Sequence, residues 1–148
     1  MKYEIYSNLE TNDDYSIFEF ISTGAKGNIR KRITFTLTEW QNVYNLAFGD
    51  IVENDNIDDY SVTGNGDRNK ILATIARVVD FYTDRYPNRW VYFQGSTIER
   101  TRLYRMAISI NIQELSQKFD IYAEISDKSS FVLFNRNLDC KAFLIKRK

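Results

Sequence analysis

The chain has 148 residues, of which 43% are hydrophobic and 15% aromatic, so it is long and apolar enough to fold as one domain with a sizeable core. Its 20 basic and 20 acidic residues balance, which excludes a strong overall field that would recruit nucleic acid or membranes. Histidine is absent, which excludes Ser-His and Cys-His nucleophile pairs and nearly all catalytic zinc sites.

Cysteine occurs once, at Cys140, so the chain cannot form an internal disulfide and suits a reducing compartment. We interpret Cys140 as a packed side chain, because only Lys141 stands nearby to favour a thiolate. No apolar run approaches the roughly 18 residues that cross a membrane, and residues 1–4 lack the apolar segment of a signal peptide. The expected location is the cytoplasm, with no membrane partner.

The first part of the chain predicts β-strands. Residues 2–6 alternate tyrosine and isoleucine with polar residues, which indicates a short strand before a polar loop at 8–14. Residues 15–22 and 28–38 alternate apolar and polar side chains on either side of a glycine-containing turn, so they are expected to pair as a hairpin. Residues 43–51 follow as another strand.

One face of the predicted hairpin is basic. Arg30 and Arg32 share one face of the second strand, whereas Lys31 falls on the apolar face. With Lys26 at the turn, the two arginines could contact the phosphates of a nucleic acid. We favour a solvated sheet surface, because no aromatic side chain stands among these charges to stack on bases. A nucleic-acid partner stays the alternative for this face.

An acidic loop at residues 53–59 supplies oxygen ligands of the kind that bind a hard cation. The loop lacks the glycine and the closing glutamate of a calcium-binding loop, so we interpret it as solvated. The sequence therefore predicts no metal site.

Two helices are predicted around one buried strand. The first, at residues 67–85, follows a glycine loop and ends before Pro87. The apolar strand at 90–93 leads to a second helix, for which Ser96 and Glu99 predict a capping box. Two helix starts thus lie beside the end of one strand, where unpaired N–H groups and helix dipoles favour an anion.

The last part of the chain predicts a short helix that continues to Lys118, followed by strands at 119–125, 131–134 and 142–145. The order of elements predicts a single α+β domain over residues 1–148. We expect a mixed, mostly antiparallel sheet with an N-terminal hairpin and a helix–strand–helix crossover.

Over residues 43–125 this order resembles the GNAT acetyltransferase fold without its first two helices. Gly64-Asn65-Gly66 is similar to the loop that holds the coenzyme A pyrophosphate in that family. Thr97 stands where the family has an asparagine, and Leu103-Tyr104 matches a Leu-Tyr pair whose tyrosine protonates the departing thiolate. The resemblance implies an acyl-CoA-dependent N-acyltransferase or a degenerate relative, with acetyl-CoA as cofactor, Tyr104 as general acid, and Glu19 or the acidic loop as base.

Two residues depart from the GNAT pattern. Ser61 stands where a glutamine or arginine would donate to phosphate. Asp67 stands at the helix start, where its carboxylate is expected to cap the N–H groups and repel a pyrophosphate. At about 4 Å and an effective dielectric of about 20, like charges cost about 4 kcal/mol. Coenzyme A binding is therefore expected to be poor unless Asp67 turns away.

The alternative function is a non-catalytic module that binds an anionic ligand through the Gly95-Ser96-Thr97 turn and the arginines Arg100 and Arg102. These arginines differ by roughly 200° in direction on a helix, so only one is expected to face a site. A salt bridge of either arginine with Asp67 would instead be structural. The ten tyrosines are also compatible with a homodimer.

The whole chain is also similar to an uncharacterised family of small bacterial proteins. The resemblance rests on these segments: Ser22-Thr23-Gly24-Ala25-Lys26-Gly27, Tyr44-Asn45-Leu46-Ala47-Phe48-Gly49-Asp50, Asn65-Gly66-Asp67, Gly95-Ser96-Thr97, Arg100-Thr101-Arg102-Leu103-Tyr104, and the ending Ala142-Phe143-Leu144-Ile145-Lys146-Arg147-Lys148. No activity follows from that family, so it supports the domain limits alone.

Overall fold

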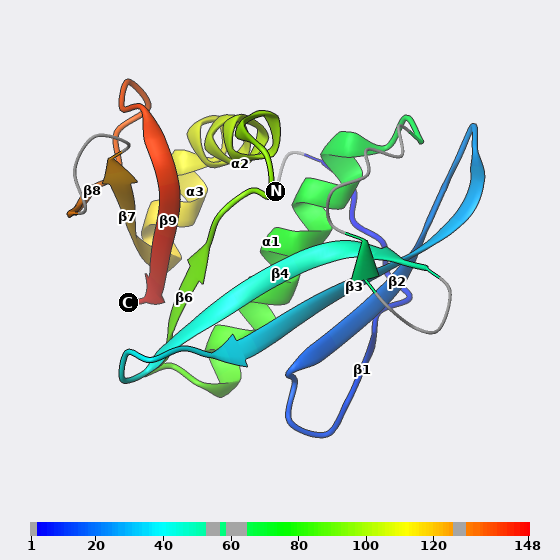
Figure 1. Ribbon diagram of the computed structural model, residues 1–148, viewed down its shortest axis with the longest axis horizontal. Helices are drawn as coiled ribbons and strands as arrows, with labels where there is room; N and C mark the ends of the chain where they lie inside the picture. Colours follow the sequence, from blue (N-terminus) through cyan, green and yellow to red (C-terminus); the bar gives the residue numbers. More distant parts are fainter. Residues whose placement is uncertain (1–2, 53–56, 59–64, 126–129) are drawn as a thin grey trace.

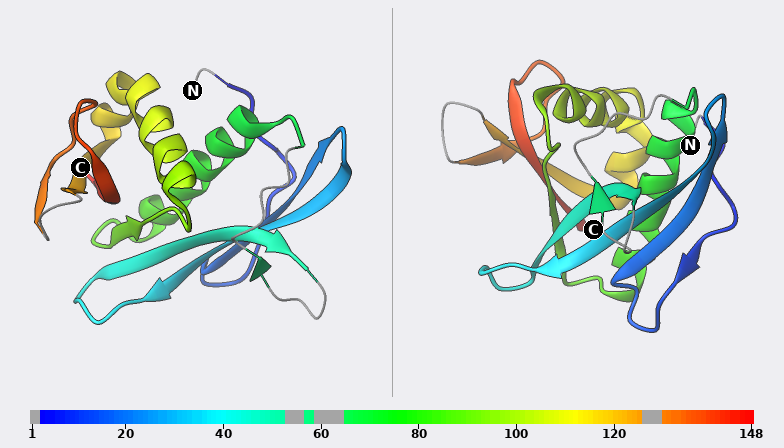
Figure 2. Two further views of the ribbon diagram at one scale, coloured as in Figure 1. Left: turned by 45° about the horizontal axis from the view of Figure 1, so that its top comes forward. Right: turned by 45° about the vertical axis from the view of Figure 1, so that its right-hand side comes forward.

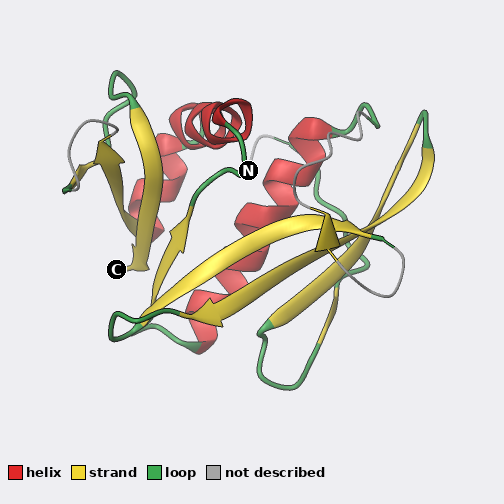
Figure 3. Cartoon of the chain, in the orientation of Figure 1, coloured by secondary structure: helices red, strands yellow, loops and turns green. Residues whose placement is uncertain are grey.

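The computed structural model describes residues 3–52, 57–58, 65–125 and 130–148 (Figure 1). Within these residues, strands of one mixed sheet combine with three helices (Figure 3). The strands are β1 (Glu10–Thr11), β2 (Ile17–Gly24), β3 (Gly27–Leu37), β4 (Val43–Ile51), β5 (Ile57–Asp58), β6 (Trp90–Phe93), β7 (Phe119–Ile125), β8 (Phe131–Leu133) and β9 (Cys140–Arg147), and the helices are α1 (Arg68–Arg85), α2 (Ile98–Ile110) and α3 (Ile112–Lys118).

The strands lie in the order β1-β2-β3-β4-β6-β9-β7-β8, and β5 pairs with β4. Only β4 and β6 run parallel; the other described pairs are antiparallel. Helix α1 connects the two parallel strands, because such a pair needs a crossover. The predicted α+β class, mixed sheet, N-terminal hairpin and helix–strand–helix crossover are all confirmed.

The parallel strands β4 and β6 separate after a short pairing. They pair from Val43 with Trp90 to Leu46 with Phe93. Beyond Leu46, β4 continues to Ile51 beside β3 and β5, whereas the chain after Phe93 turns toward α2. Figure 1 shows the far ends of β4 and β6 pointing apart. The result is a V-shaped divergence in the sheet, with its wide end toward the starts of α1 and α2.

The core lies between the sheet and the helices. Figure 2 (left) shows α1 and α2 side by side above β3 and β4. Tyr82 of α1 is 1% exposed, and its ring stacks on Phe35 of β3 with 3.7 Å between centroids. Val91 of β6 and Phe143 of β9 are fully buried on the same side of the sheet. The apolar stripe predicted for the first helix therefore packs as its 3.6-residue period requires.

The predicted strand at residues 2–6 is wrong for the described residues 3–6, which form no strand. Tyr6 instead packs on the core, with its ring stacked on Phe20 at 5.3 Å and its backbone N–H donating to Thr74 Oγ1 of α1 at 2.9 Å. The backbone N–H of Tyr6 thus bonds to a helix instead of to a neighbouring strand. The alternation of apolar and polar residues does not distinguish these two cases. The first strand is β1, within the segment predicted as a polar loop.

The alternation predicted for β3 is confirmed. Lys31 is 4% exposed on the core side, where its ammonium pairs with the buried carboxylate of Asp50 on β4. Arg32 points to the opposite face and donates from Nε to Glu19 of β2 at 2.7 Å, and Arg30 also lies near Glu19. The basic face of the hairpin is thus partly neutralised by a carboxylate of its own sheet.

Tyr92 of β6 lies on the sheet face away from the helices and donates to Glu124 Oε1 of β7 at 3.2 Å. Burial, followed by the Glu124 charge, raises the pKa of Tyr92 from 10.0 to about 12. A raised folded pKa means that the neutral phenol stabilises the fold fully below pH 10, and this contribution is lost as the pH rises toward 12.

We therefore expect the stability difference between the wild type and Tyr92→Phe to shrink from pH 9 to pH 11.5. The free energy of unfolding in urea, measured for both proteins at each pH, checks this expectation. Using the difference between the two proteins removes the contribution of the other tyrosines. A difference that is constant across this range would contradict the burial and the Glu124 contact that together raise the pKa of Tyr92.

Candidate functional site

An open groove lies between the starts of α1 and α2, and we call it the helix-start groove. Its volume is about 980 Å³. Its walls come from the N-terminal segment, Lys31 of β3, Phe48 of β4 and the first halves of α1 and α2. The lining residues that carry charge are Glu4, Lys31, Asp67, Arg68, Lys70 and Arg100. Because Lys31 is paired with the buried Asp50, three other cations against two carboxylates give the groove a slightly cationic character.

The carboxylate of Asp67 is turned away from the start of α1. Asp67 occupies the N-cap position but makes no side-chain cap bond. Its Oδ2 instead accepts hydrogen bonds from the hydroxyls of Tyr6 and Ser22. The prediction that this carboxylate caps the helix is therefore wrong, because two hydroxyl donors from distant segments compete successfully for it. The first N–H groups of α1 are therefore not capped by this carboxylate, and Asp67 still lines the groove.

The first turn of α1 carries cations where helices usually carry acids. Arg68 is the first helical residue, Lys70 follows two positions later, and the turn contains no acidic residue. A positive side chain at a helix N-terminus is electrostatically unfavourable, because it stands at the positive end of the helix dipole. Lys70 Nζ lies 4.3 Å from the Tyr6 ring centroid. Neither cation was singled out from the sequence, although their position in the first turn was a usable signal.

Asn65 lines the groove, and its side chain also holds the β2–β3 turn to the start of α1. It is 3% exposed; its Nδ2 donates to Ser22 Oγ at 3.1 Å and to the Gly27 carbonyl at 3.0 Å, and its Oδ1 accepts from the Lys26 N–H at 2.7 Å. Gly66 has a φ of +80°, a left-handed conformation that favours glycine, and it lines the groove. Of the predicted loop, Gly64 lies outside the described residues, as does Ser61.

The start of α2 is capped by Thr97 rather than by the predicted Ser96. Thr97 Oγ1 accepts from the Arg100 N–H at 3.2 Å. The predicted capping box is wrong, because Arg100 and not Glu99 then stands three residues after the cap. Gly95 lies close against the helix, since a Cβ there would come within 2.3 Å of the Thr101 nitrogen. Ser96 and Thr97 are not among the residues that line the helix-start groove.

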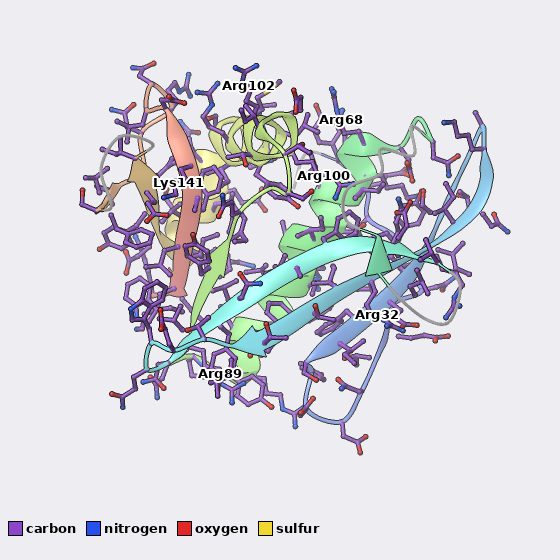
Figure 4. The ribbon with its side chains drawn as sticks, in the orientation of Figure 1. Arg32, Arg68, Arg89, Arg100, Arg102 and Lys141 are labelled. Carbon is purple, nitrogen blue, oxygen red and sulfur yellow. The ribbon has the colours of Figure 1, made fainter. Side chains whose placement is uncertain are left out.

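The two arginines of α2 point in different directions, as predicted. Figure 4 shows Arg100 on the side of α2 that faces α1, whereas Arg102 projects away from it. Arg100 lines the helix-start groove, and Arg102 is exposed and outside it. Neither arginine forms a salt bridge with Asp67, whose carboxylate is held by Tyr6 and Ser22. Of these two arginines, only Arg100 lines the groove.

Tyr104 lies at the inner end of the groove. It is half-buried, and its ring packs edge-to-face on Phe93 with 5.5 Å between centroids. Leu103 and Tyr104 line both the helix-start groove and a smaller apolar cavity behind it. The predicted Leu-Tyr pair therefore stands where the polar and apolar hollows adjoin.

The other residues considered for chemistry lie elsewhere. Glu19 is on the sheet face away from the helices and is engaged by Arg30 and Arg32. Most of the acidic loop lies outside the described residues. Cys140 is buried, and burial raises the pKa of its thiol, which disfavours the reactive thiolate. Among the described residues, no cluster of His, Cys, Asp or Glu is arranged to hold a metal ion.

The sheet, the helices and the groove define an α+β protein with a mixed sheet and a cationic groove at two helix starts. The chain belongs to the family of unknown function DUF6934, whose model matches residues 2–148. This match confirms the whole-chain resemblance to an uncharacterised family. Comparison with curated proteins and comparison with solved structures both give no match, so neither supports the GNAT resemblance over residues 43–125. In the part of the chain that the structure describes, no helix combines the length and hydrophobicity required to span a bilayer.

Proposed function

We propose that this protein binds an acyl-CoA-type ligand in the helix-start groove, as a degenerate relative of the N-acyltransferases. One observation carries the proposal. The start of α1 opens into a groove lined by Arg68, Lys70 and Arg100, and the carboxylate of Asp67 does not cap that helix start. A phosphate-bearing ligand meets backbone N–H groups, a helix dipole and arginines in such a place.

Charge and geometry together favour a phosphate ester over a small carboxylate. The groove is about 980 Å³ in volume, which lies in the range for an extended cofactor. Arg68 and Arg100 come from different helices and line the same hollow, so they can contact separate oxygens of one pyrophosphate. Each charge-assisted hydrogen bond contributes about 1.5–3 kcal/mol.

The GNAT resemblance supports the same ligand class. In that fold the cofactor sits in the gap between two diverging parallel strands. Here β4 and β6 pair in parallel as far as Leu46 and Phe93, and Phe48 of β4, beyond that pairing, lines the groove. Within this proposal Gly66 and the buried Asn65 shape the phosphate loop, and Tyr104 stands near the thioester end. Ser96 and Thr97 contribute by fixing the start of α2, which positions Arg100.

The geometry of the groove is compatible with a non-catalytic binding module and with an acyltransferase. An activity test with a Tyr104 variant distinguishes the two. If Tyr104 is a general acid, acetyl-CoA and an amine acceptor will yield free coenzyme A thiol, and Tyr104→Phe will slow its release while leaving acetyl-CoA affinity unchanged. If the wild type binds acetyl-CoA and releases no thiol with any amine, the protein is a non-catalytic module.

Replacing Asp67 with asparagine is expected to tighten coenzyme A binding by about tenfold. The substitution removes a negative charge that lines the groove and keeps an oxygen for the Tyr6 and Ser22 hydroxyls. Tenfold corresponds to about 1.4 kcal/mol, roughly a third of the 4 kcal/mol that two like charges cost at about 4 Å. Isothermal titration calorimetry measures the affinity.

The control for this substitution is Asp84→Asn, which removes the same charge from the exposed far end of α1. Its coenzyme A affinity should equal that of the wild type. An Asp67→Asn variant that is folded and binds coenzyme A no better than Asp84→Asn would show that no anion sits near the start of α1.

A further inference from the structure

A second hollow, the apolar cavity, lies between α1 and α2 above the sheet. Its volume is about 190 Å³. Leu72 and Val79 line it from α1, Ala107 from α2, Leu115 from α3, and Leu46 and Phe93 from the sheet. The hollow is open to solvent, since the exposed side chains of Met106 and Ile110 also line it, so an apolar group can enter it from outside the chain.

Small side chains on the two helices create this space. Ala76 of α1 and Ala107 of α2 both line the cavity. A larger aliphatic residue at either position would fill it and would ordinarily be favoured, because filling an apolar cavity stabilises a protein. Two alanines at such positions indicate room kept for an apolar group from outside the chain.

The apolar cavity adjoins the helix-start groove. Leu72, Ile75, Leu103 and Tyr104 line both hollows, so a ligand can occupy the two at once. Arg68 also lines both hollows. A molecule that fits both has its charged part beside Arg68 and Arg100 and its apolar part among side chains that line the cavity alone, such as Val79 and Leu115. This is the chemistry of an acyl thioester whose carrier bears phosphate.

We infer that the ligand carries a straight acyl chain of about six to eight carbons, which enters the apolar cavity. The length follows from volume: an apolar cavity of about 150 Å³ holds one benzene molecule, with six carbons. The cavity here is slightly larger, at about 190 Å³. This inference rests on the proposed acyl-CoA binding and specifies the substrate class. An acetyl group would leave most of the cavity empty.

Calorimetric titration with octanoyl-CoA and acetyl-CoA tests the inference on the full chain. Burying one methylene group strengthens binding by up to about fourfold. Octanoyl-CoA is therefore expected to bind at least about 30-fold more tightly than acetyl-CoA. Equal affinity for both esters overturns the inference and leaves the proposed function standing. Binding of neither ester overturns both.

Filling the cavity should remove the preference for the longer chain. Ala107→Leu is expected to lower the affinity for octanoyl-CoA at least tenfold and to leave that for acetyl-CoA within about twofold, because the added side chain takes the volume of the acyl chain. Ala47→Leu is the matched control, since Ala47 lines neither hollow. Ala76→Leu fills the cavity from α1 instead, and it replaces Ala107→Leu in this test if that variant does not fold. A filled variant that keeps the wild-type preference overturns the inference.

Discussion

Replacing Lys31 with methionine is expected to lower the free energy of unfolding by about 3–5 kcal/mol, the cost of removing one partner from a buried ion pair. Lys31 is 4% exposed and Asp50 is 5% exposed, so water can replace little of the lost interaction. The substitution keeps most of the aliphatic volume of lysine and removes the ammonium that offsets the Asp50 carboxylate. Urea denaturation measures the loss.

Arg32→Met is the control for this prediction. Arg32 follows Lys31 in the same strand and also pairs with a carboxylate of a neighbouring strand, but on the other face of the sheet. Its partner Glu19 is partly exposed, so the expected loss is about 1 kcal/mol or less. The double variant Lys31→Met/Asp50→Leu should recover much of the stability that Lys31→Met alone loses. Equal losses for Lys31→Met and Arg32→Met would contradict the burial assigned to Lys31.

Arg100→Ala is expected to weaken coenzyme A binding by about 10- to 100-fold, and Arg102→Ala is expected to leave it unchanged. The magnitude corresponds to one charge-assisted hydrogen bond of about 1.5–3 kcal/mol. The two variants remove the same side chain from the same helix, and only Arg100 lines the helix-start groove. Calorimetry gives the affinity of each variant.

The melting temperature of each arginine variant distinguishes a ligand contact from a structural role. If Arg100 acts on the ligand, Arg100→Ala loses affinity with a melting temperature close to that of Arg102→Ala. A fall in melting temperature with unchanged affinity would assign Arg100 to the fold instead. Equal affinities for the two variants would remove Arg100 from the site.

Local sequence patterns predicted most of the fold. The stripe of apolar residues in α1, the alternation in β2 and β3, and the short apolar β6 each follow from a period that neighbouring residues set. Residues 3–6 were mispredicted because the backbone of Tyr6 bonds to Thr74, which lies 68 positions further along the chain. A partner at that distance leaves no local pattern.

The arrangement of the two helix starts was predicted from the sequence, and the contacts around them were predicted less well. Two helix starts beside one strand could be read from glycines and capping residues, and helix phase indicated that Arg100 and Arg102 diverge. The orientation of Asp67 depends on Tyr6 and Ser22, which only the tertiary structure brings to it. Ser22 at a core position of β2 was a usable signal, because a buried hydroxyl needs a partner.

The most direct test of the groove as a coenzyme A site is a titration of the wild-type protein with coenzyme A, followed by calorimetry and thermal unfolding. We predict binding at one site per chain. At about 100 times the Kd, the ligand should stabilise the protein by about 2.7 kcal/mol and raise the melting temperature by about 5–10 °C. Absence of both heat and thermal stabilisation at millimolar coenzyme A would contradict the account.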